Sequence, residues 1–376
     1  MIIAHTADWH LGVSTHSNPG TGLPTRTQDS IEAIRRIIDK VAEEDVDLLT
    51  ISGDIFHTTK PSPNVLDAAY ELYYYALETL GEQTQIITIA GNHDNKPADG
   101  VGPVGLLGKM FIDSWPYLQF YESVNNTSYN GRRIDIRPCE VGNECPSPLP
   151  GKYDISLCHA FFEEAKFGSE GRMMAGGIGV LSGNTAPLVL AGHIHKPQKI
   201  EQEYELDGEK RKRTILYPGS PMKFTFDDRK DERGFWLVDY DDDNGDFTSE
   251  FINVNTRPMV QLEIDSDDIS DENLSKCSNA DVKIVIKCNS PLDVDLVKIK
   301  KKIKEAGAFY LAPIDVAVRR ANRARDESIT VDESCYDCLG NFIPHILDTD
   351  VKKSVIKKEA ISIMKYVMEK QVAKQK

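Results

Sequence analysis

The chain of 376 residues contains no long apolar segment and only a few cysteines. No run approaches the roughly 18 consecutive apolar residues of a transmembrane helix, so we expect no membrane span. The seven cysteines are odd in number and scattered, which does not indicate a disulfide framework. The first residues also lack the basic, apolar and small-residue regions of a secretory signal. Together these absences predict a reduced, cytoplasmic protein.

Positive charge is scarce as well, because 44 lysines and arginines face 59 acidic residues and leave a net charge of −15. Since phosphate affinity comes largely from lysine and arginine, this balance taken alone argues against a nucleic-acid-binding protein. Divalent cations bound at a carboxylate-rich site would invert the local field, so net charge constrains solubility more than function. Three basic clusters are candidate phosphate contacts, although such runs are more often solvated faces: 209–213, 298–304 and 319–325.

Two patterns that would indicate bound cofactors are incomplete. The stretch "GPVGLLGK" at 102–109 is one residue too long for a phosphate-binding loop, and Met110 stands where serine or threonine is required. We therefore expect no ATP site. Cys335, Cys338 and His345 offer three zinc ligands, but a structural site needs about four, and no second pair lies nearby. A zinc site is therefore not expected there.

The first two thirds of the chain alternate strand and helix patterns. Helical periodicity covers about 27–44 and 62–80, and the second helix begins at Ser62-Pro63, a cap residue followed by a first-turn proline. Apolar runs predict buried strands at 1–5, 46–53, 84–91, 153–158 and 187–191. Later segments predict an antiparallel meander of strands at 197–206, 212–217 and 233–240. Residues 1–255 are thus predicted to form one layered α/β domain.

A change of composition follows, and the segment 253–258 has the composition of a linker. A β-α-β-α-β pattern then predicts a smaller α/β domain over 256–320, with these strands and helices in order: 259–265, 270–277, 281–288, 292–306 and 308–318. A charged linker at 321–338 leads to a helical segment at 339–376. There, apolar residues recur on one face of a lysine-rich helix at about 351–370, and this apolar face requires another protein surface to pack against it.

Five short motifs follow apolar runs of strand type in the first domain: "DWH" (8–10), "GDIFH" (53–57), "GNHD" (91–94), "CHAFF" (158–162) and "GHIH" (192–195). In an open α/β sheet, ligands collect at the carboxyl ends of the strands, so we expect these loops to converge. A lone histidine at a strand end is usually a surface or core residue, but all five motifs in order are hard to obtain by chance. The gathered candidates are Asp8, His10, Asp54, Asn92, His93, His159, His193 and His195.

The residue types point to metal chemistry. Carboxylate, imidazole and amide oxygen together suit Mn²⁺, Fe²⁺ or Zn²⁺, whereas sites made only of oxygen would favour Mg²⁺ or Ca²⁺. Eight candidates exceed the ligands that one ion uses, so the set favours two metals about 3.5–4 Å apart, bridged by a carboxylate. Asp54 is the natural bridge, because it is the central carboxylate on a different strand from Asp8.

The order of these motifs resembles that of the calcineurin-like metallophosphoesterase superfamily: D-x-H, G-D, G-N-H-D, a separate histidine and G-H-x-H. Longer stretches resemble its SbcD family, the nuclease subunit of the double-strand-break repair complex: "TADWHLG", "GDIFHTTKPSP", "IAGNHD", "AGHIHKPQ", "YPGSP" (217–221) and "ERGFWLVD" (232–239). The resemblance implies a β-sandwich flanked by helices over 1–255 and a DNA-binding capping domain over 256–320. It covers the first domain in motif detail and the second by position and pattern.

The resemblance also assigns roles to residues of this chain. It implies one metal held by Asp8, His10, Asp54 and His195, and a second held by Asp54, Asn92, His159 and His193. His93 corresponds to the family's catalytic histidine, and Asp94 beside it is expected to orient its ring. His57 corresponds to a histidine that contacts substrate; its alternative is a loop residue that caps the helix at 62–80. The two ions are expected to be Mn²⁺, with Mg²⁺ as the alternative.

The function implied by the family is a 3′-to-5′ exonuclease on duplex ends and an endonuclease on single strands. Its partners would be DNA, a second copy of the chain, and a coiled-coil ATPase of the SbcC type, docked on the helical segment 339–376. We expect this in the cytoplasm of a prokaryotic or phage-infected cell. Two alternatives stay open: a phosphoesterase acting on phosphoproteins or small phosphate esters, and a mainly architectural subunit that bridges DNA ends. The helical segment also has an alternative, in which it folds back on the second domain.

Overall fold

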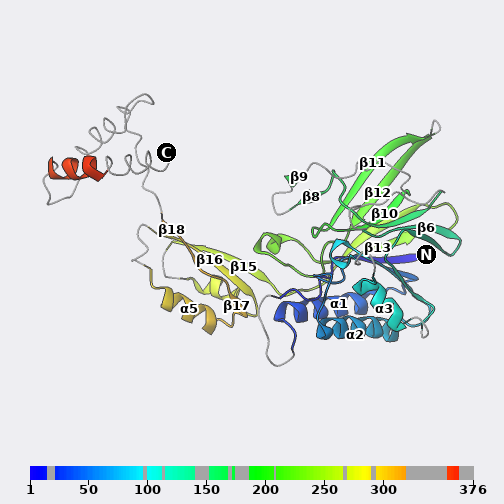
Figure 1. The fold of residues 1–376 in the computed structure, drawn as a ribbon, viewed down its shortest axis with the longest axis horizontal. Helices are drawn as coiled ribbons and strands as arrows, with labels where there is room; N and C mark the ends of the chain where they lie inside the picture. Colours follow the sequence, from blue (N-terminus) through cyan, green and yellow to red (C-terminus); the bar gives the residue numbers. More distant parts are fainter. Residues whose placement is uncertain are drawn as a thin grey trace.

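The structure, a computed structural model, contains two stacked six-stranded sheets and a smaller four-stranded sheet (Figure 1). It describes residues 1–14, 22–95, 100–111, 115–139, 152–167, 172–173, 186–206, 209–265, 269–288, 294–318 and 354–363. None of the helices in these ranges is both long and apolar enough to cross a membrane.

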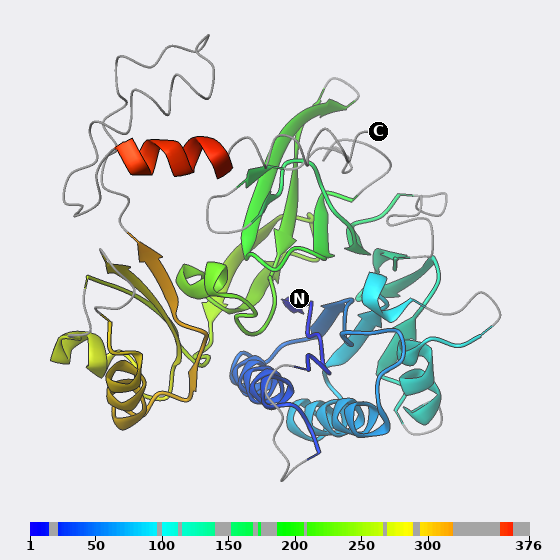
Figure 2. The same cartoon turned by 60° about the vertical axis from the view of Figure 1, so that its left-hand side comes forward.

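The first large sheet contains the N-terminal strands in parallel. Its strand order is β14 (Phe247–Asn253), β13 (Gly234–Tyr240), β1 (Ile2–Thr6), β2 (Leu48–Ser52), β3 (Gln85–Ile89) and β4 (Leu118–Tyr121). Strands β1 to β4 run parallel, and β13 pairs with β1 in the antiparallel direction. Three helices pack on the outer face of this sheet: α1 (Thr25–Glu43), α2 (Pro63–Leu80) and α3 (Pro103–Phe111) (Figure 2).

The second large sheet lies against the inner face of the first. Its strand order is β11 (Gln198–Leu206), β12 (Glu209–Tyr217), β10 (Leu188–Gly192), β7 (Ile155–His159), β6 (Arg132–Arg137) and β5 (Asn125–Tyr129). Alternation along the strands divides the core, since Ala4 faces the helices while Ile3 faces the second sheet. A two-stranded hairpin, β8 (Lys166–Phe167) with β9 (Arg172–Met173), and two short 3₁₀ helices, η1 (Asn92–Asp94) and η2 (Phe226–Lys230), complete the sandwich. This is the predicted layered α/β sandwich flanked by helices.

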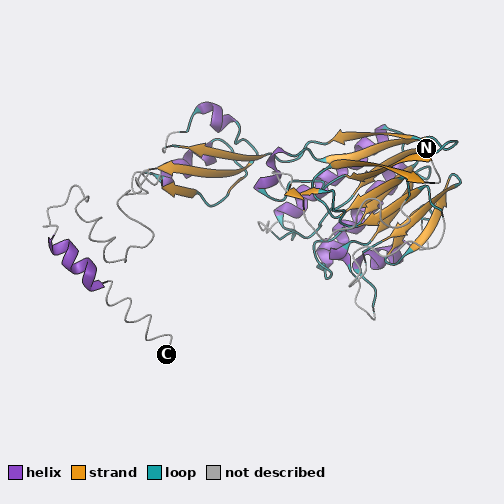
Figure 3. Ribbon diagram, turned by 90° about the horizontal axis from the view of Figure 1, so that it is seen from above, coloured by secondary structure: helices purple, strands orange, loops and turns teal. Residues whose placement is uncertain are grey.

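The smaller sheet has a core of its own and forms what we call the small unit, residues 259–318 (Figure 3). Its elements in chain order are β15 (Met259–Ile264), α4 (Asp271–Ser275), β16 (Asp281–Cys288), α5 (Leu296–Glu305), β17 (Tyr310–Leu311) and β18 (Asp315–Val318). Ile299 and Ile303, one helical turn apart, bury the inner stripe of α5 against the sheet. The predicted β-α-β-α-β order is confirmed, except that the last strand is divided in two around Pro313.

One other expectation about the strands was wrong, and several strands were missed. The segment from 197 to 240 is not one meander, because β12 pairs in parallel with β10 while β13 crosses to the other sheet. Strands β4, β5 and β6 were not predicted at all, although they extend both large sheets. The helix predicted at 62–80 begins after Ser62 as expected, but the Ser62 side chain makes no capping hydrogen bond.

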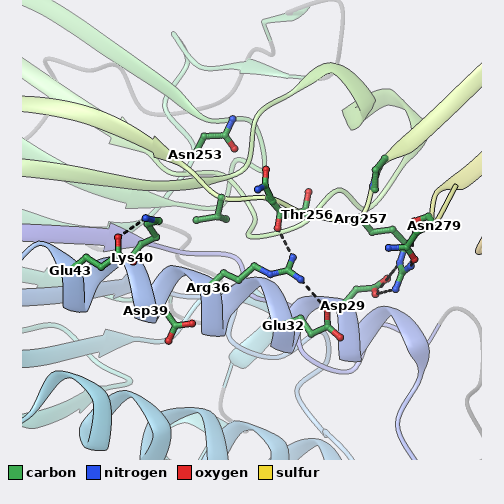
Figure 4. Close-up of a pocket in the computed structure, with 13 residues that line it drawn as sticks. Asp29, Glu32, Arg36, Asp39, Lys40, Glu43, Asn253, Thr256, Arg257 and Asn279 are labelled. Atoms are coloured by element: carbon green, nitrogen blue, oxygen red, sulfur yellow. Dashed lines mark hydrogen bonds and ion pairs between the residues drawn. The ribbon is translucent and has the colours of Figure 1, made fainter. Parts of the chain in front are cut away.

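Ion pairs join helix α1 to the small unit and to the segment 253–258 that precedes it. Arg257 donates to both carboxylate oxygens of Asp29 at 2.7–3.1 Å, and its guanidinium lies 3.5 Å from the ring centroid of Phe309. Arg26 donates to Asp281 at 2.8 Å. A polar groove of about 620 Å³ runs beside these pairs, between α1 and the segment 253–258 (Figure 4). The orientation of the small unit on the sandwich is therefore held by charge-assisted hydrogen bonds.

The C-terminal expectations fall largely outside the described residues. A helix covers 354–363, within the amphipathic helix predicted at about 351–370. The charged linker 321–338 and the residues Cys335, Cys338 and His345 lie outside the described part of the chain.

Candidate metal centre

The loops after β1 and β2 are joined by backbone hydrogen bonds beyond the end of the sheet. Asp8 N donates to Gly53 O at 3.0 Å, and His10 N donates to Asp54 O at 2.9 Å. These bonds continue the parallel pairing of β1 with β2 into the two motifs. The side chains of Asp8, His10 and Asp54 are all buried, so the loops present them from a fixed backbone.

Several candidate ligands have a strained backbone. In the described residues, seven non-glycine residues have positive φ, and four of them are Asp8 (55°), His10 (45°), Asp54 (52°) and His193 (99°). The left-handed region is unfavourable for residues with a Cβ, and such strain is concentrated at functional sites. The concentration of strain at the predicted ligands is independent of the motif pattern and points to the same site.

Two glycines allow the strand ends to approach one another. A Cβ on Gly91 would lie 2.1 Å from Asp54 Oδ1, and a Cβ on Gly192 would lie 1.9 Å from Ser52 O. Neither position has space for any larger residue. The glycines of "GNHD" and "GHIH" therefore let the ligands from β2, β3 and β10 share one small volume.

The structure brings the predicted ligands into two clusters; Asp54 lies close to histidines of both, and Asp8 also has ligand atoms of both groups nearby. In the first, His10 Nε2 lies 2.9 Å from His195 Nε2 and 3.5 Å from Asp54 Oδ2, and Asp8 belongs to the same group of ligand atoms. In the second, Asn92 Oδ1 lies 2.9 Å from His159 Nε2 and 3.0 Å from His193 Nδ1.

Asp54 lies between the two clusters. Its Oδ2 atom is 3.5 Å from His159 Nε2, the same distance as from His10 Nε2. A carboxylate with one oxygen equally close to ligands of both groups has the position that a bridging ligand requires.

The protonation of the imidazoles fits a metal site. Burial lowers the pKa of His10, His193 and His195, the last two to about 4, so all three rings are neutral near pH 7. Neutral imidazole is the form that binds a metal. The Nε2 atoms of His10 and His195 lie close enough for both to face one ion; without an ion, one proton between them forms a single N–H···N hydrogen bond.

His159 behaves differently because two buried carboxylates face it. Burial lowers its pKa, but the charges of Asp54 and Asp8 outweigh burial and raise it to about 9. His159 correspondingly holds the pKa of Asp54 below its usual range in spite of burial, while burial raises that of Asp8 to about 7. Without an ion, a proton on His159 supplies the positive charge that the carboxylates require; a divalent ion would displace it.

A backbone carbonyl orients the ring of His159. Its Nδ1 lies 2.8 Å from Ser52 O, and since a carbonyl only accepts, Nδ1 carries the proton that it donates. Its Nε2 therefore points toward Asn92 and Asp54. Metal-binding histidines commonly have such an outer partner, which fixes the ring and the tautomer.

His93 is held beside the clusters by its backbone and its ring. Its N donates to Asp54 Oδ1 at 2.9 Å, and its Nδ1 donates to the carbonyl of His57 at 2.8 Å. The ring lies edge-on to His10, with centroids 4.8 Å apart, and is stacked on His57 at 5.5 Å. Because Nδ1 is occupied, Nε2 is the atom that remains for a substrate.

Asp94 does not orient His93 as expected. Its carboxylate accepts hydrogen bonds from the backbone N–H groups of Ile55, Phe56 and Gly91, at 2.9–3.0 Å. It therefore ties the loop after β2 to the loop after β3. The carbonyl of His57 takes the orienting role that was expected of Asp94, and His57 does not cap α2 through any described hydrogen bond.

Three residues outside the five motifs lie around the site, and no role was expected of them from the sequence. Arg233, whose side chain is buried, donates to the carbonyl of His195 and, at 3.2 Å, to Ser220 Oγ. Phe224 lies with its ring centroid 5.4 Å from those of both His10 and His195. Arg233 lies in "ERGFWLVD" and Ser220 in "YPGSP", so the available signal was in these two motifs.

Two other residues near the first motif, His5 and Trp9, belong to the core. His5 is fully buried and bonds Thr50 Oγ1 at 3.0 Å and Ala191 O at 3.2 Å, as expected for a core histidine. Trp9 packs on Tyr73 beneath α2, and its Nε1 donates to Thr6.

Comparison with known proteins agrees with this geometry. Residues 1–197 match the family of calcineurin-like phosphoesterases. The DNA double-strand break repair protein Mre11 of Methanopyrus kandleri is 28% identical over 82% of this chain and 69% of its own length. The SbcD component of the nuclease SbcCD of Staphylococcus epidermidis is 24% identical over 72% of this chain and 74% of its own length.

A third relative, the Mre11 protein of Archaeoglobus fulgidus, is 26% identical over 72% of this chain and 62% of its own length. The family match covers more than half of the 376 residues, and the relatives extend it beyond the first domain. The chain therefore belongs to the calcineurin-like phosphoesterases, metal-dependent hydrolases of phosphate esters, and within them to the family of SbcD and Mre11.

Proposed function

We propose that this protein is a metal-dependent DNA nuclease, a 3′-to-5′ exonuclease on duplex ends and an endonuclease on single strands. It would act in double-strand-break processing, recombination or replication. The observation that carries the proposal is the pair of ligand clusters that share Asp54, with its Oδ2 3.5 Å from both His10 and His159. The relatives named as a repair protein and as part of a nuclease support DNA as the substrate.

The ligand sets follow from the two clusters. One ion would be held by Asp8, His10, Asp54 and His195. The other would be held by Asp54, Asn92, His159 and His193. The mixture of imidazole, carboxylate and amide oxygen favours Mn²⁺ over Mg²⁺. When bound, two such ions would supply an activated water for in-line attack on a phosphodiester and positive charge against the charge that develops.

His93 is the residue proposed to act on the leaving group. Its Nδ1 donates to the His57 carbonyl, so only Nε2 is free to face a substrate oxygen. In the protonated form, Nε2 donates to a phosphate oxygen or to the leaving oxygen, which stabilises the charge or completes its protonation. His57, stacked on His93, is placed to contact the phosphodiester strand beside it.

Contacts to DNA are proposed for the small unit. Helix α5 carries five lysines, and the ion pair of Lys301 is with Glu305 of the same helix. Such a cluster suits contacts with phosphates, which position DNA without selecting sequence. The basic segment 209–213 is a weaker candidate, because the acidic residues of β11 face it; Glu203 is opposite Lys212, and Glu205 opposite Lys210.

We further propose a homodimer and a complex with an SbcC-type ATPase in the cytoplasm. The dimer is supported by exposed apolar side chains on α2 and α3, namely Tyr74, Leu106 and Met110, which are 41–48% exposed. The ATPase is proposed to dock on the segment 339–376, whose described helix leaves Val355 and Ile363 exposed. Deleting 339–376 should abolish co-purification with the ATPase while Mn²⁺ binding is retained; a complex that survives the deletion would contradict this docking site.

The central experiment compares DNA with a small ester. Purified wild type and the His93→Ala variant are assayed with end-labelled duplex DNA and with p-nitrophenyl phosphate, in Mn²⁺ and in Mg²⁺. We expect DNA cleavage by wild type in Mn²⁺, and a loss of about 100-fold or more in His93→Ala, the contribution of a general acid. Because His93 is proposed to lie outside the ligand sets, Mn²⁺ affinity measured by calorimetry should be unchanged in the variant.

Each alternative has its own outcome in this experiment. Hydrolysis of the small ester with intact DNA would favour a phosphoesterase that acts on small esters or phosphoproteins. Bridging of DNA ends with no cleavage in either metal would favour an architectural role. Loss of Mn²⁺ binding in His93→Ala would contradict the placement of His93 outside the ligand sets.

A further inference from the structure

A cleft of about 340 Å³ lies directly beside the metal centre and has no role in the chemistry described so far. Its lining includes two proposed metal ligands, His193 and His195, and two aromatic rings, Phe167 and Phe224. Both rings are half-buried, so each keeps part of its surface exposed. The cleft is therefore continuous with the place where the scissile phosphate would be held.

Phe224 is fixed in position from both sides. Its N donates to Asp228 Oδ2 at 3.0 Å, and the preceding carbonyl, that of Lys223, accepts a hydrogen bond from the buried Arg26. Its ring packs against His10, with interplanar angle 88°, and against His195, with interplanar angle 51°. A ring held in this way can receive a flat ligand without a further loss of conformational entropy.

The charged groups around the cleft are already neutralised in part. Asp228 accepts from two backbone N–H groups and lies 3.4 Å from the Arg233 guanidinium. Lys196 at the rim lies 3.8 Å from Asp231. A phosphate would find no unpaired cation here among the described residues, whereas a flat uncharged ring would find two phenyl rings.

We propose that this cleft, the Phe224 cleft, is a stacking subsite for the nucleobase next to the scissile phosphate. The inference rests on the proposed nuclease function, and it names the part of the substrate that this region recognises. Aromatic stacking is tolerant of sequence, because every base has a π-face. A base that enters the cleft must leave the duplex stack, which costs least at a frayed end or in a single strand. The subsite thus selects unpaired nucleotides.

The test uses oligonucleotides with one cleavable linkage, all others being phosphorothioates. The nucleotide on each side of that linkage is in turn either normal or abasic, and kcat/KM is measured in Mn²⁺. Stacking on one ring corresponds to about 5- to 150-fold in affinity, so Phe224→Ala should lower kcat/KM by that factor on the normal substrate. On the substrate that is abasic at the stacked position, wild type and Phe224→Ala should differ by less than about twofold.

Matched variants separate stacking from packing. Phe224→Leu keeps apolar bulk against His10 and His195 but lacks a flat ring, so it should behave as Phe224→Ala does. Phe224→Tyr keeps the ring and should restore most of the kcat/KM that Phe224→Leu loses on the normal substrate. Phe120→Leu removes a half-buried ring on β4 and serves as the control. All four should bind Mn²⁺ with wild-type affinity by calorimetry.

Equal losses on normal and abasic substrates, or no loss on either, would overturn the subsite while leaving the nuclease function intact. Weakened Mn²⁺ binding in Phe224→Leu would also overturn it, because the ring would then act through His10 and His195. If wild type cleaves p-nitrophenyl phosphate and none of the oligonucleotides, the nuclease function itself fails, and the subsite fails with it.

Discussion

Arg233 offers the sharpest test of how the metal centre is supported. Its guanidinium donates to the carbonyl of His195 and to Ser220 Oγ from a fully buried position. A lysine at this position keeps the charge but replaces the planar fork by a single ammonium, which is not suited to both acceptors. The Arg233→Lys variant should therefore loosen the loop that carries His195 without removing any ligand atom.

The size of the effect can be worked from these contacts. A hydrogen bond that involves a charged group contributes about 1.5–3 kcal/mol, and loss of an outer partner of a metal ligand typically lowers affinity by about 10- to 100-fold. With Mn²⁺ well above its dissociation constant, that loss removes about 1.4–2.7 kcal/mol of metal-dependent stabilisation. We expect Arg233→Lys to lower Mn²⁺ affinity by about 10- to 100-fold, measured by calorimetry. The loss of metal-dependent stabilisation should appear as a smaller Mn²⁺-induced rise in Tm.

Arg137 provides the matched control. Its side chain is also buried, and it lies 2.9 Å from Asp135 in the second sheet, where it contacts no proposed ligand. Arg137→Lys should lower the stability of the apoprotein in a similar way but leave Mn²⁺ affinity unchanged. If the two variants bind Mn²⁺ equally well, Arg233 acts on the fold alone, and the reasoning that connects it to His195 is refuted.

Three further predictions concern pH, the small unit and the ligand loops. Burial lowers the pKa of His5 to about 4, so between pH 6.5 and 4 only the unfolded state takes up its proton. Lowering the pH from 7 to 5 should remove about 2 kcal/mol of stability through His5 alone, so in urea titrations the loss of stability should be smaller by about this amount in His5→Gln. Asp29→Ala leaves Arg257 without its carboxylate partner and should cost about 3 kcal/mol, with faster hydrogen exchange in 253–258; unchanged exchange there would contradict the role of this pair. Gly91→Ala places a Cβ 2.1 Å from Asp54 Oδ1 and should abolish Mn²⁺ binding in a folded protein, whereas calorimetry showing wild-type affinity would contradict the described approach of the two loops.

The parts of the fold that were predicted are those whose pattern is local. Strands β1, β2 and β3 are buried on both faces, so each is mainly apolar and can be recognised in isolation. Strands β5 and β6 lack such a signal for two reasons. The first is an edge strand with no fully buried residue, and the second buries the polar pair Asp135 and Arg137 inside the sheet.

The sheet to which a strand belongs is not a local property. Strands β11, β12 and β13 follow one another closely, which predicts a meander, yet β13 leaves its neighbours and pairs with β1. This pairing joins Trp236 to His5, residues more than 200 positions apart, and puts the indole in the core between the sheets. The pairing depends on the burial of both strands in one core, and no short stretch of sequence contains both strands.

The same distinction explains the metal centre. Each motif follows its own strand, and three of the motifs contain a glycine, so Asp54, Asn92 and His193 could be found from short stretches. The groups that orient them come from elsewhere: the carbonyl of His57 for His93, and Arg233 for the loop of His195. Asp94 shows that a residue adjacent in sequence need not be the one that orients a functional side chain. It is adjacent to His93 in sequence, but the 3₁₀ turn of η1 directs its carboxylate to backbone N–H groups of the neighbouring loop. The ligands of such a site can therefore be predicted from sequence, whereas the contacts that set their direction depend on the packing of distant segments.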